Sequence, residues 1–223
     1  MDLENYYSES FKNILLKEVK MPVITIARQL GAGGKTLGEM VAKKLGYTFY
    51  DNEIIQLIAE KANVSEDAVF STEKNTTSSF MKFVSGIMPK TFADRAKENK
   101  QDALDEIIYV DLLNLIIEDI AKNGNAVILG RGSQYILAER GDTFHILLIA
   151  EDAHRKRFLS KKYNLTEEQT ISAIKVEDKR RENLYRRFGK KDYDKWNNYH
   201  MIINMTKTDL EAAVNQICCL VNR

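Results

Sequence analysis

Residues 23–46 constrain the fold of this chain more than any other stretch, because they have the pattern of a buried strand, a glycine-rich turn and a helix. Residues 23–27 form a short β-branched apolar run, as expected of a central strand in a parallel sheet. Apolar residues then recur at helical spacing from Leu37 to Leu45, and Gly46 stands where a glycine commonly ends a helix. The stretch therefore predicts one βα unit around which the other elements are arranged.

The turn between these two elements has the composition of a phosphate-binding loop. It contains Gly31, Gly33 and Gly34, whose missing Cβ atoms let backbone N–H groups approach an anion at the positive end of the helix. Lys35 and Thr36 follow in the order used by a P-loop. In such a loop the ammonium reaches the transferred phosphoryl group and the hydroxyl is a ligand of Mg²⁺.

Two other interpretations of the turn remain open. The complete G-x-x-x-x-G-K-[ST] pattern has a glycine where this chain has Gln29, so the turn could be a tight βα connection without a ligand. Gly31 and Gly33 also begin a G-x-G-x-x-G pattern, and Asp51 lies near the spacing of a ribose-binding acid in dinucleotide-binding proteins. In that pattern Thr36 occupies the place of the third glycine.

Four further apolar runs predict strands at residues 47–50, 126–129, 144–150 and 201–204. Helical patterns separate or follow them at residues 102–122, from residue 151, from a capping box at Thr166-x-x-Gln169, and from a second cap at Thr208-x-x-Glu211. Alternating strands and helices with short connections predict a three-layer α/β/α fold with a five-stranded parallel sheet.

Charged residues follow several of the predicted strands. Asp51, Arg131 and Glu151 each stand at or just after the end of an apolar run, as does the glycine turn. Because the carboxyl ends of parallel strands meet at one edge of the sheet, where ligands bind, we expect these residues to converge on a site. Taken alone, Arg131 could equally be an ordinary surface arginine.

Composition excludes several functional classes. The 33 basic and 32 acidic residues give a net charge of +1, which argues against a general binder of nucleic acid polymers or membrane surfaces. Residues 155–191 nevertheless hold 13 basic and 5 acidic residues, which indicates either a cationic site or a solvated helical face. The adjacent cysteines, Cys218 and Cys219, fit a reducing compartment. The sequence has no apolar run of about 18 residues and no signal-peptide pattern, so we predict a cytoplasmic protein.

Five segments together resemble the cytidylate kinase-like family: IARQLGAGGKT at 26–36, FYD at 49–51, ILGRG at 128–132, DKRRENLY at 178–185 and NYHMIIN at 198–204. The resemblance covers about residues 21–222, although a region near 65–100 has no matching motif. It implies a nucleoside monophosphate kinase of the P-loop group, which transfers the terminal phosphoryl of ATP to a CMP-like acceptor with Mg²⁺.

The resemblance also implies roles for single residues. The ATP phosphates would lie against Gly31, Ala32, Gly33, Gly34, Lys35 and Thr36, with Thr36 on the metal and with Asn204 and Thr206 near the adenine. Asp51 and Arg131 would bind the acceptor. Arg180 and Arg181 match an arginine-rich lid, and Lys35, Arg131 and this pair would be catalytic. Gly132 departs from the family's Gly-Arg-Asp motif, since it replaces the acidic residue.

We therefore expect a single domain with a core at about residues 21–50, 102–160 and 197–223. An acceptor-binding insertion would span about residues 51–101, and a helical lid about residues 163–196. A nucleotide-binding regulatory protein without turnover and an NAD(P)-binding oxidoreductase remain as alternatives.

Overall fold

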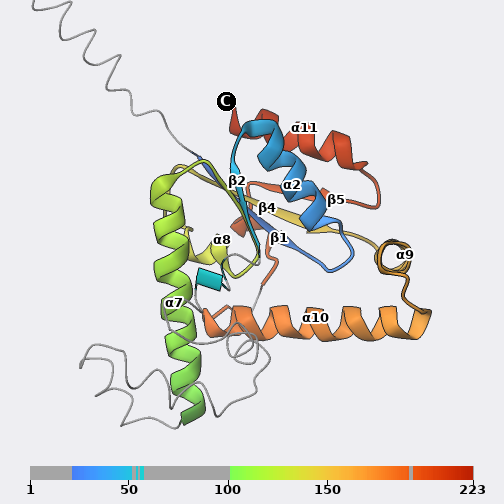
Figure 1. The fold of residues 1–223 in the computed structure, drawn as a ribbon, viewed down its shortest axis with the longest axis horizontal. Coiled ribbons are helices and arrows are strands. Elements are labelled where there is room, and N and C mark those ends of the chain that lie inside the picture. The colour runs from blue at the N-terminus through green and yellow to red at the C-terminus, as the bar shows by residue number, and fades with distance from the viewer. Residues whose placement is uncertain (1–21, 52–53, 55, 58–100, 191–192, 223) are drawn as a thin grey trace, which may run out of the picture.

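In the computed structural model, residues 22–51, 54, 56–57, 101–190 and 193–222 of the chain are described, and they form a three-layer α/β fold (Figure 1). Its sheet is parallel throughout, with the strand order β2-β3-β1-β4-β5. The strands are β1 (Val23–Arg28), β2 (Thr48–Tyr50), β3 (Ala126–Leu129), β4 (Thr143–Ile149) and β5 (Met201–Asn204). The five-stranded parallel sheet and its strand positions, predicted from the apolar runs, are confirmed to within a residue or so.

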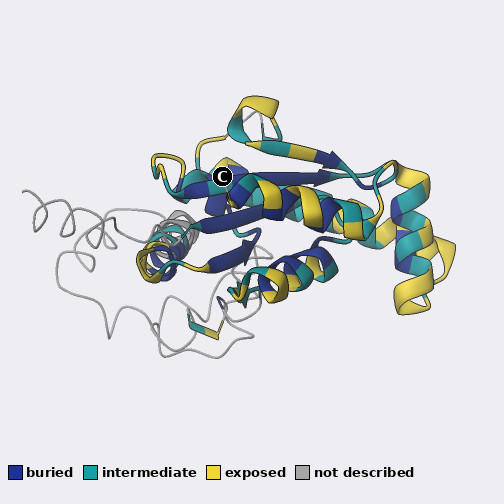
Figure 2. Cartoon of the chain, turned by 90° about the horizontal axis from the view of Figure 1, so that it is seen from above, coloured by how far each residue is buried: buried dark blue, intermediate teal, exposed yellow. Residues whose placement is uncertain are grey.

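Helices cover both faces of the sheet because the central strands are apolar on both sides. Ile24 and Ile26 of β1 pack in one buried cluster with α2 (Gly34–Leu45) and α11 (Leu210–Val221), whereas Val23 packs in a second cluster with α7 (Gln101–Asn123). Figure 2 shows the central strands β1, β3 and β4 largely buried between these helices, whose outward faces are exposed. This burial is the main source of the fold's stability.

The remaining helices in the described residues are α8 (Ser133–Ile136), α9 (Asp152–Tyr163) and α10 (Glu167–Arg187), with a 3₁₀ turn, η1 (Trp196–Asn198). The single turn α8 was not predicted, because four residues are too few to show a helical period. In the part of the chain that the structure describes, no helix is both long and apolar enough to cross a membrane.

The two predicted helix caps have different outcomes. Thr166 and Gln169 form the capping box of α10, with each side chain bonded to the other residue's backbone N–H, as predicted. The predicted cap at Thr208 is wrong: the cap of α11 is Asp209, whose Oδ1 accepts a hydrogen bond of 2.8 Å from the N–H of Ala212. A carboxylate is a better partner than a hydroxyl for the positive end of a helix.

The predicted acceptor-binding insertion at residues 51–101 lies almost wholly outside the described residues. The predicted lid at 163–196 includes α10, which runs along the edge of the molecule below the carboxyl ends of the strands (Figure 1). The proposed division into core, insertion and lid stays a prediction.

A buried histidine sits within the sheet. His145 on β4 is paired with Thr25 on β1, and the Thr25 hydroxyl lies 2.7 Å from its Nδ1. Its side chain is buried, and its Nε2 has no hydrogen-bond partner among the described residues. Burial, followed by the neighbouring His200, lowers the pKa of His145 to about 4.

We predict that this histidine makes the fold sensitive to acid. An unfolded histidine binds a proton below a pH of about 6.5, whereas the native His145 stays neutral down to a pH of about 4. The free energy of unfolding should therefore fall as the pH is lowered between these values, by up to about 3 kcal/mol from this group. In His145→Gln, which keeps a hydrogen-bonding side chain but cannot titrate, this loss should disappear.

Urea unfolding at pH 7.5 and pH 5 measures the effect, with His154→Gln as the control for loss of a histidine elsewhere. Equal losses of stability in the wild type and His145→Gln would contradict the prediction.

Candidate functional site

The glycine turn is held in a conformation that side chains would prevent. Gly31 has a φ of +86°, and a Cβ there would lie 2.8 Å from the Cα and the carbonyl oxygen of Arg155 on α9. Gly33, with a φ of +78°, is the N-cap of α2, and a Cβ there would meet no atom within 4 Å. The backbone N–H groups at the start of α2 therefore face an open space, which suits an anion.

Gln29 stands where a complete P-loop has glycine, and its side chain bonds to the backbone of the neighbouring strand. Its Oε1 accepts a hydrogen bond of 2.9 Å from the N–H of Ala150, just after β4, and its own N–H donates to the carbonyl of Leu148. Its carbonyl oxygen accepts from Ala32. Gln29 thus fastens the start of the turn to the neighbouring strand, so the departure from the motif is compatible with a formed loop.

A cavity of about 160 Å³, which we call the glycine-turn pocket, opens beside this turn. Lys35 and Thr36, in the first turn of α2, line it together with three of the glycines and with Arg28, Leu30 and Asp51. The Thr36 hydroxyl accepts a hydrogen bond of 2.8 Å from the ammonium of Lys162 on α9. A cation therefore already lies at the hydroxyl that was predicted to hold Mg²⁺.

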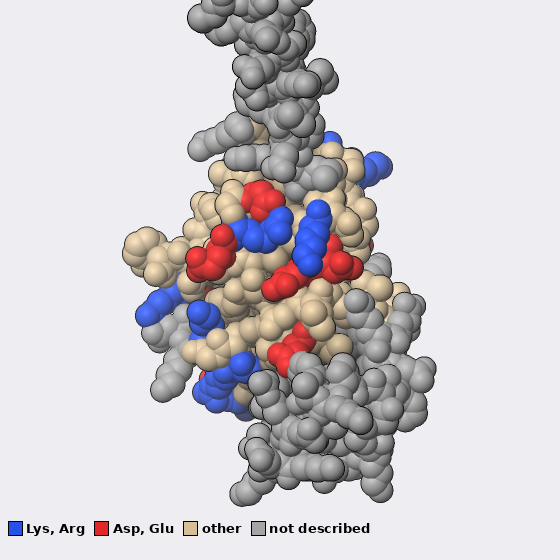
Figure 3. Space-filling view, turned by 90° about the vertical axis from the view of Figure 1, so that its left-hand side faces the viewer, with Lys and Arg blue, Asp and Glu red and all other residues tan. Residues whose placement is uncertain are grey.

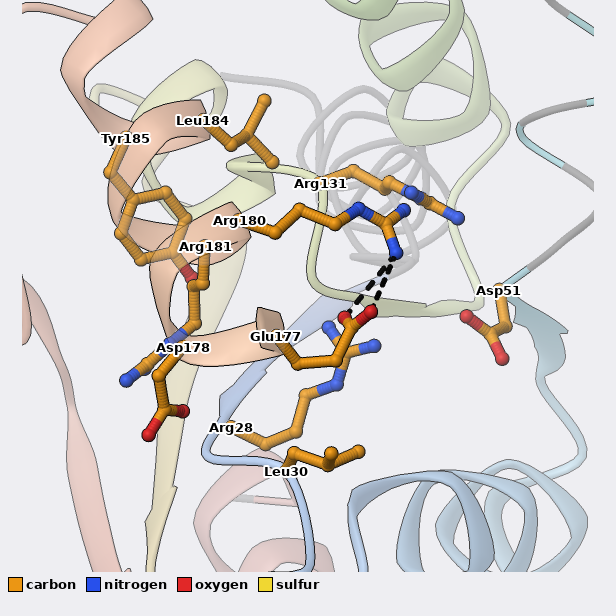
Figure 4. A pocket seen from close by; sticks show the side chains of 10 residues that line it. All are labelled: Arg28, Leu30, Asp51, Arg131, Glu177, Asp178, Arg180, Arg181, Leu184 and Tyr185. Atoms are coloured by element: carbon orange, nitrogen blue, oxygen red, sulfur yellow. Dashed lines mark hydrogen bonds and ion pairs between the residues drawn. The ribbon is translucent and has the colours of Figure 1, made fainter. Parts of the chain in front are cut away.

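The second cavity, the arginine pocket, has a volume of about 230 Å³ and lies beside α10 (Figure 4). Its charged lining comes from four segments far apart in the sequence: the end of β1, the residue after β2, the turn after β3, and α10. Those residues are Arg28, Asp51, Arg131, Glu177, Asp178, Arg180 and Arg181. Such a gathering of guanidinium groups suits a ligand with phosphate or carboxylate oxygens.

Arg131 is presented by a turn of unusual backbone geometry. Gly130, Arg131 and Gly132 have φ angles of +74°, +58° and +73°. A non-glycine residue in the left-handed region costs free energy, and such residues are enriched at functional sites. At Gly132 a Cβ would lie 2.4 Å from the ring of Phe188, so the acidic residue of the related motif would not fit here.

The two lid arginines point in different directions. Arg180 extends toward Arg131 and the interior of the pocket and pairs with Glu177 at 3.2 Å (Figure 4). Arg181 turns away, and its Nη1 donates to both carboxylate oxygens of Asp194 at 3.0 and 2.8 Å. The sequence predicted the pair as one unit, whereas the structure gives the two residues distinct surroundings.

Arg155 connects the glycine turn to α10, and sequence reasoning missed this. Its side chain is only 4% exposed, its Nε donates to the carbonyl of Leu30 at 2.7 Å, and its Nη2 donates to both oxygens of Asp178 at 2.8 Å. A third partner, Asp152, lies at 3.4 Å and is exposed. The buried guanidinium therefore joins the glycine turn directly to α10.

The two residues expected near adenine are only partly placed at a pocket. Thr206 lines a third cavity with Ala32, Gly33 and Thr36, although its hydroxyl also accepts a hydrogen bond of 2.8 Å from the N–H of Glu151. Asn204 lines none of the three cavities found in the described residues, and its Oδ1 accepts from the N–H of Thr206 at 3.0 Å. Asn204 thus supports the loop that carries Thr206.

The geometry fits a nucleotide with its phosphates on the glycine turn, because the open N-terminus of α2, Lys35 and Thr36 face one cavity. It also fits a phosphate-bound Mg²⁺, which usually takes only one or two protein ligands. In the described residues no group of three His, Cys, Asp or Glu side chains forms a metal site, so Thr36 is the protein ligand the turn offers. Lys162 would have to leave that hydroxyl.

We predict that the Arg155–Asp178 pair stabilises the fold. Asp178→Ala leaves a nearly buried guanidinium without its main partner and should lower the free energy of unfolding by about 2 kcal/mol. The loss should be smaller than that from breaking a fully buried ion pair, because Asp178 is partly exposed. Asp152→Ala removes only the exposed partner of the same arginine and should cost less than about 1 kcal/mol. Denaturant unfolding of both variants measures the two losses in the free energy of unfolding. Equal losses would contradict a stabilising role for the Arg155–Asp178 pair.

Comparisons with known proteins agree with this fold. The family model described as the cytidylate kinase-like family matches residues 23–207. A crystal structure of an uncharacterised protein from Eubacterium ventriosum is similar with a TM-score of 0.60 and 17% identity, over 90% of this chain and 98% of that one. At this identity the likeness is one of fold.

Two kinase structures are less similar. Shikimate kinase from Bacteroides thetaiotaomicron has a TM-score of 0.47 and 17% identity, over 91% of this chain and 99% of that one. Deoxyadenosine kinase from M. mycoides with bound dATP has a TM-score of 0.46 and 15% identity, over 91% of this chain and 100% of that one. No curated protein sequence matched the chain.

Proposed function

The chain belongs to the cytidylate kinase-like family, and from that premise we propose that it transfers the terminal phosphoryl of ATP to a nucleoside monophosphate or a related small acceptor. The observation that carries this proposal is the meeting of two cavities. Arg28, Leu30 and Asp51 line both the glycine-turn pocket and the arginine pocket. A donor phosphate in the first would therefore adjoin an acceptor phosphate in the second.

The strand order supports a kinase over the dinucleotide-binding alternative. In a dinucleotide-binding sheet the second strand lies beside the first. Here β3 separates β2 from β1, so Asp51 and Arg131 follow neighbouring strands and line one pocket. Lys35 and the pocket arginines would have no task in hydride transfer.

The chemistry asked of the protein is alignment and charge neutralisation. Lys35 and the backbone N–H groups of the turn would hold the donor phosphates, while Arg131 would hold the acceptor phosphate with two parallel hydrogen bonds. Arg180, on α10, would neutralise charge that spreads over the moving phosphoryl group. A bound Mg²⁺ on Thr36 would neutralise further charge on the phosphate oxygens.

The basic and acidic side chains are mixed on one face of the molecule, which fits a small acceptor (Figure 3). On the face shown in Figure 3, the described basic and acidic side chains lie in small groups close to one another, without a continuous basic stripe. Polymer binding normally needs such a stripe to neutralise several phosphates.

The experiment that tests the function is a thermal shift followed by a turnover assay. ATP with Mg²⁺ should raise the melting temperature, whereas NAD should not, because a ligand stabilises the state that binds it. ADP release should then rise with one member of a panel of nucleoside monophosphates and small hydroxylated metabolites. A shift with NAD alone would contradict the proposal, and a shift with ATP but no ADP release across the panel would favour a regulatory protein.

Lys35 should matter for rate rather than for folding. Its side chain is exposed in the first turn of α2, so Lys35→Met should leave the melting temperature unchanged, yet lower kcat by about 100-fold or more through lost charge stabilisation. Lys43→Met, at an exposed position of the same helix, is the matched control and should retain full turnover. Near-normal turnover in Lys35→Met would remove Lys35 from the site.

A further inference from the structure

Arg28, the last residue of β1, was not among the residues that the sequence indicated, yet it stands where the two pockets join. It lines both the glycine-turn pocket and the arginine pocket. In Figure 4 its guanidinium rises from the end of β1 into the space bordered by Leu30 and Glu177. No other arginine of the arginine pocket also lines the glycine-turn pocket.

Two glycines from separate turns make room for this side chain. A Cβ on Gly34, the first residue of α2, would lie 2.8 Å from Cγ of Arg28. A Cβ on Gly130, after β3, would lie 2.0 Å from its Nη1. Since any larger residue at Gly130 would displace the guanidinium, the turn that presents Arg131 also fixes the place of Arg28.

Within the described residues, the hydrogen-bond donors of Arg28 are not engaged. Burial lowers its pKa and Asp51 opposes that change, but a guanidinium stays charged near neutral pH. No hydrogen bond or ion pair joins it to another residue in the part of the chain that the structure describes, in contrast to Arg155 and Arg181. A partly desolvated cation whose donors are not engaged calls for an anionic ligand.

We propose that Arg28 is a catalytic residue that contacts the phosphoryl group in transit between the two pockets. This inference rests on the proposed function. As the P–O bond to the departing ADP breaks and a new P–O bond to the acceptor phosphate forms, the guanidinium hydrogen-bonds the oxygens of the moving group and keeps all its protons. Lys35 binds the donor phosphates and Arg131 binds the acceptor phosphate, whereas Arg28 contacts the phosphoryl group where the two pockets join.

The test compares Arg28→Met and Arg28→Lys with the wild type, using ATP alone and a bisubstrate analogue in which adenosine and an acceptor nucleoside are joined by five phosphates. Arg28→Met should weaken the bisubstrate analogue at least about 10-fold and lower kcat at least about 100-fold, while ATP binding changes less than about threefold. Arg28→Lys should recover part of the loss. Arg157→Met, an exposed arginine on α9, is the control, and circular dichroism checks folding.

A second variant tests the geometry independently of the loss of charge. Gly130→Ala should lower kcat in the wild type, because its methyl group displaces the guanidinium, but have little further effect on kcat in an Arg28→Met background. Equal effects in both backgrounds would overturn the proposal.

The outcomes separate the two claims. Phosphoryl transfer by the wild type with unchanged kcat and bisubstrate affinity in Arg28→Met would overturn the role of Arg28 and leave the kinase function standing. Equal weakening of ATP and the bisubstrate analogue would also overturn the junction role, since Arg28 would then be a donor-site residue. A wild type that binds neither ligand would overturn the proposed function and this inference with it.

Discussion

A single buried guanidinium holds the two halves of the candidate site together. Arg155 on α9 reaches the carbonyl of Leu30 in the glycine turn and both carboxylate oxygens of Asp178 on α10. Its backbone in turn approaches Gly31 so closely that only glycine fits there. Because the turn and α10 share this one partner, the arginines of α10 are placed over the ends of the strands rather than held apart in solvent.

Most of the scaffold could be predicted from the sequence, because it depends on local patterns. The apolar runs at residues 126–129 and 201–204 match β3 and β5. β3 is buried along its whole length, and a strand buried on both faces needs continuous apolar sequence. Parallel pairing then brings Asp51 and Arg131 to one edge, and both line the arginine pocket as expected. The glycine turn with Lys35 could also be predicted from the sequence, because its residues are adjacent in the chain.

What the sequence concealed depends on contacts between distant segments. From the sequence, Arg28 is only a charged residue at the end of a strand, because the neighbouring residues do not show that Gly34 and Gly130 leave space for its side chain. Arg155 was hidden in a cationic run whose other members are largely exposed. Arg180 and Arg181 point in different directions because Arg181 bonds to Asp194, 13 residues further on. The N-cap of α11 is Asp209 rather than its neighbour Thr208. The positive φ angles of residues 130–132 could be suspected only from the two glycines that flank Arg131.

A donor phosphate and an acceptor phosphate should meet where Arg28, Leu30 and Asp51 line both pockets. A crystal structure with Mg²⁺ and a nonhydrolysable ATP analogue tests this most directly. We expect the β- and γ-phosphates to lie on the backbone N–H groups of the glycine turn, with the γ-phosphate directed toward Arg28. Phosphates bound away from the glycine turn, or a γ-phosphate directed away from the arginine pocket, would contradict it.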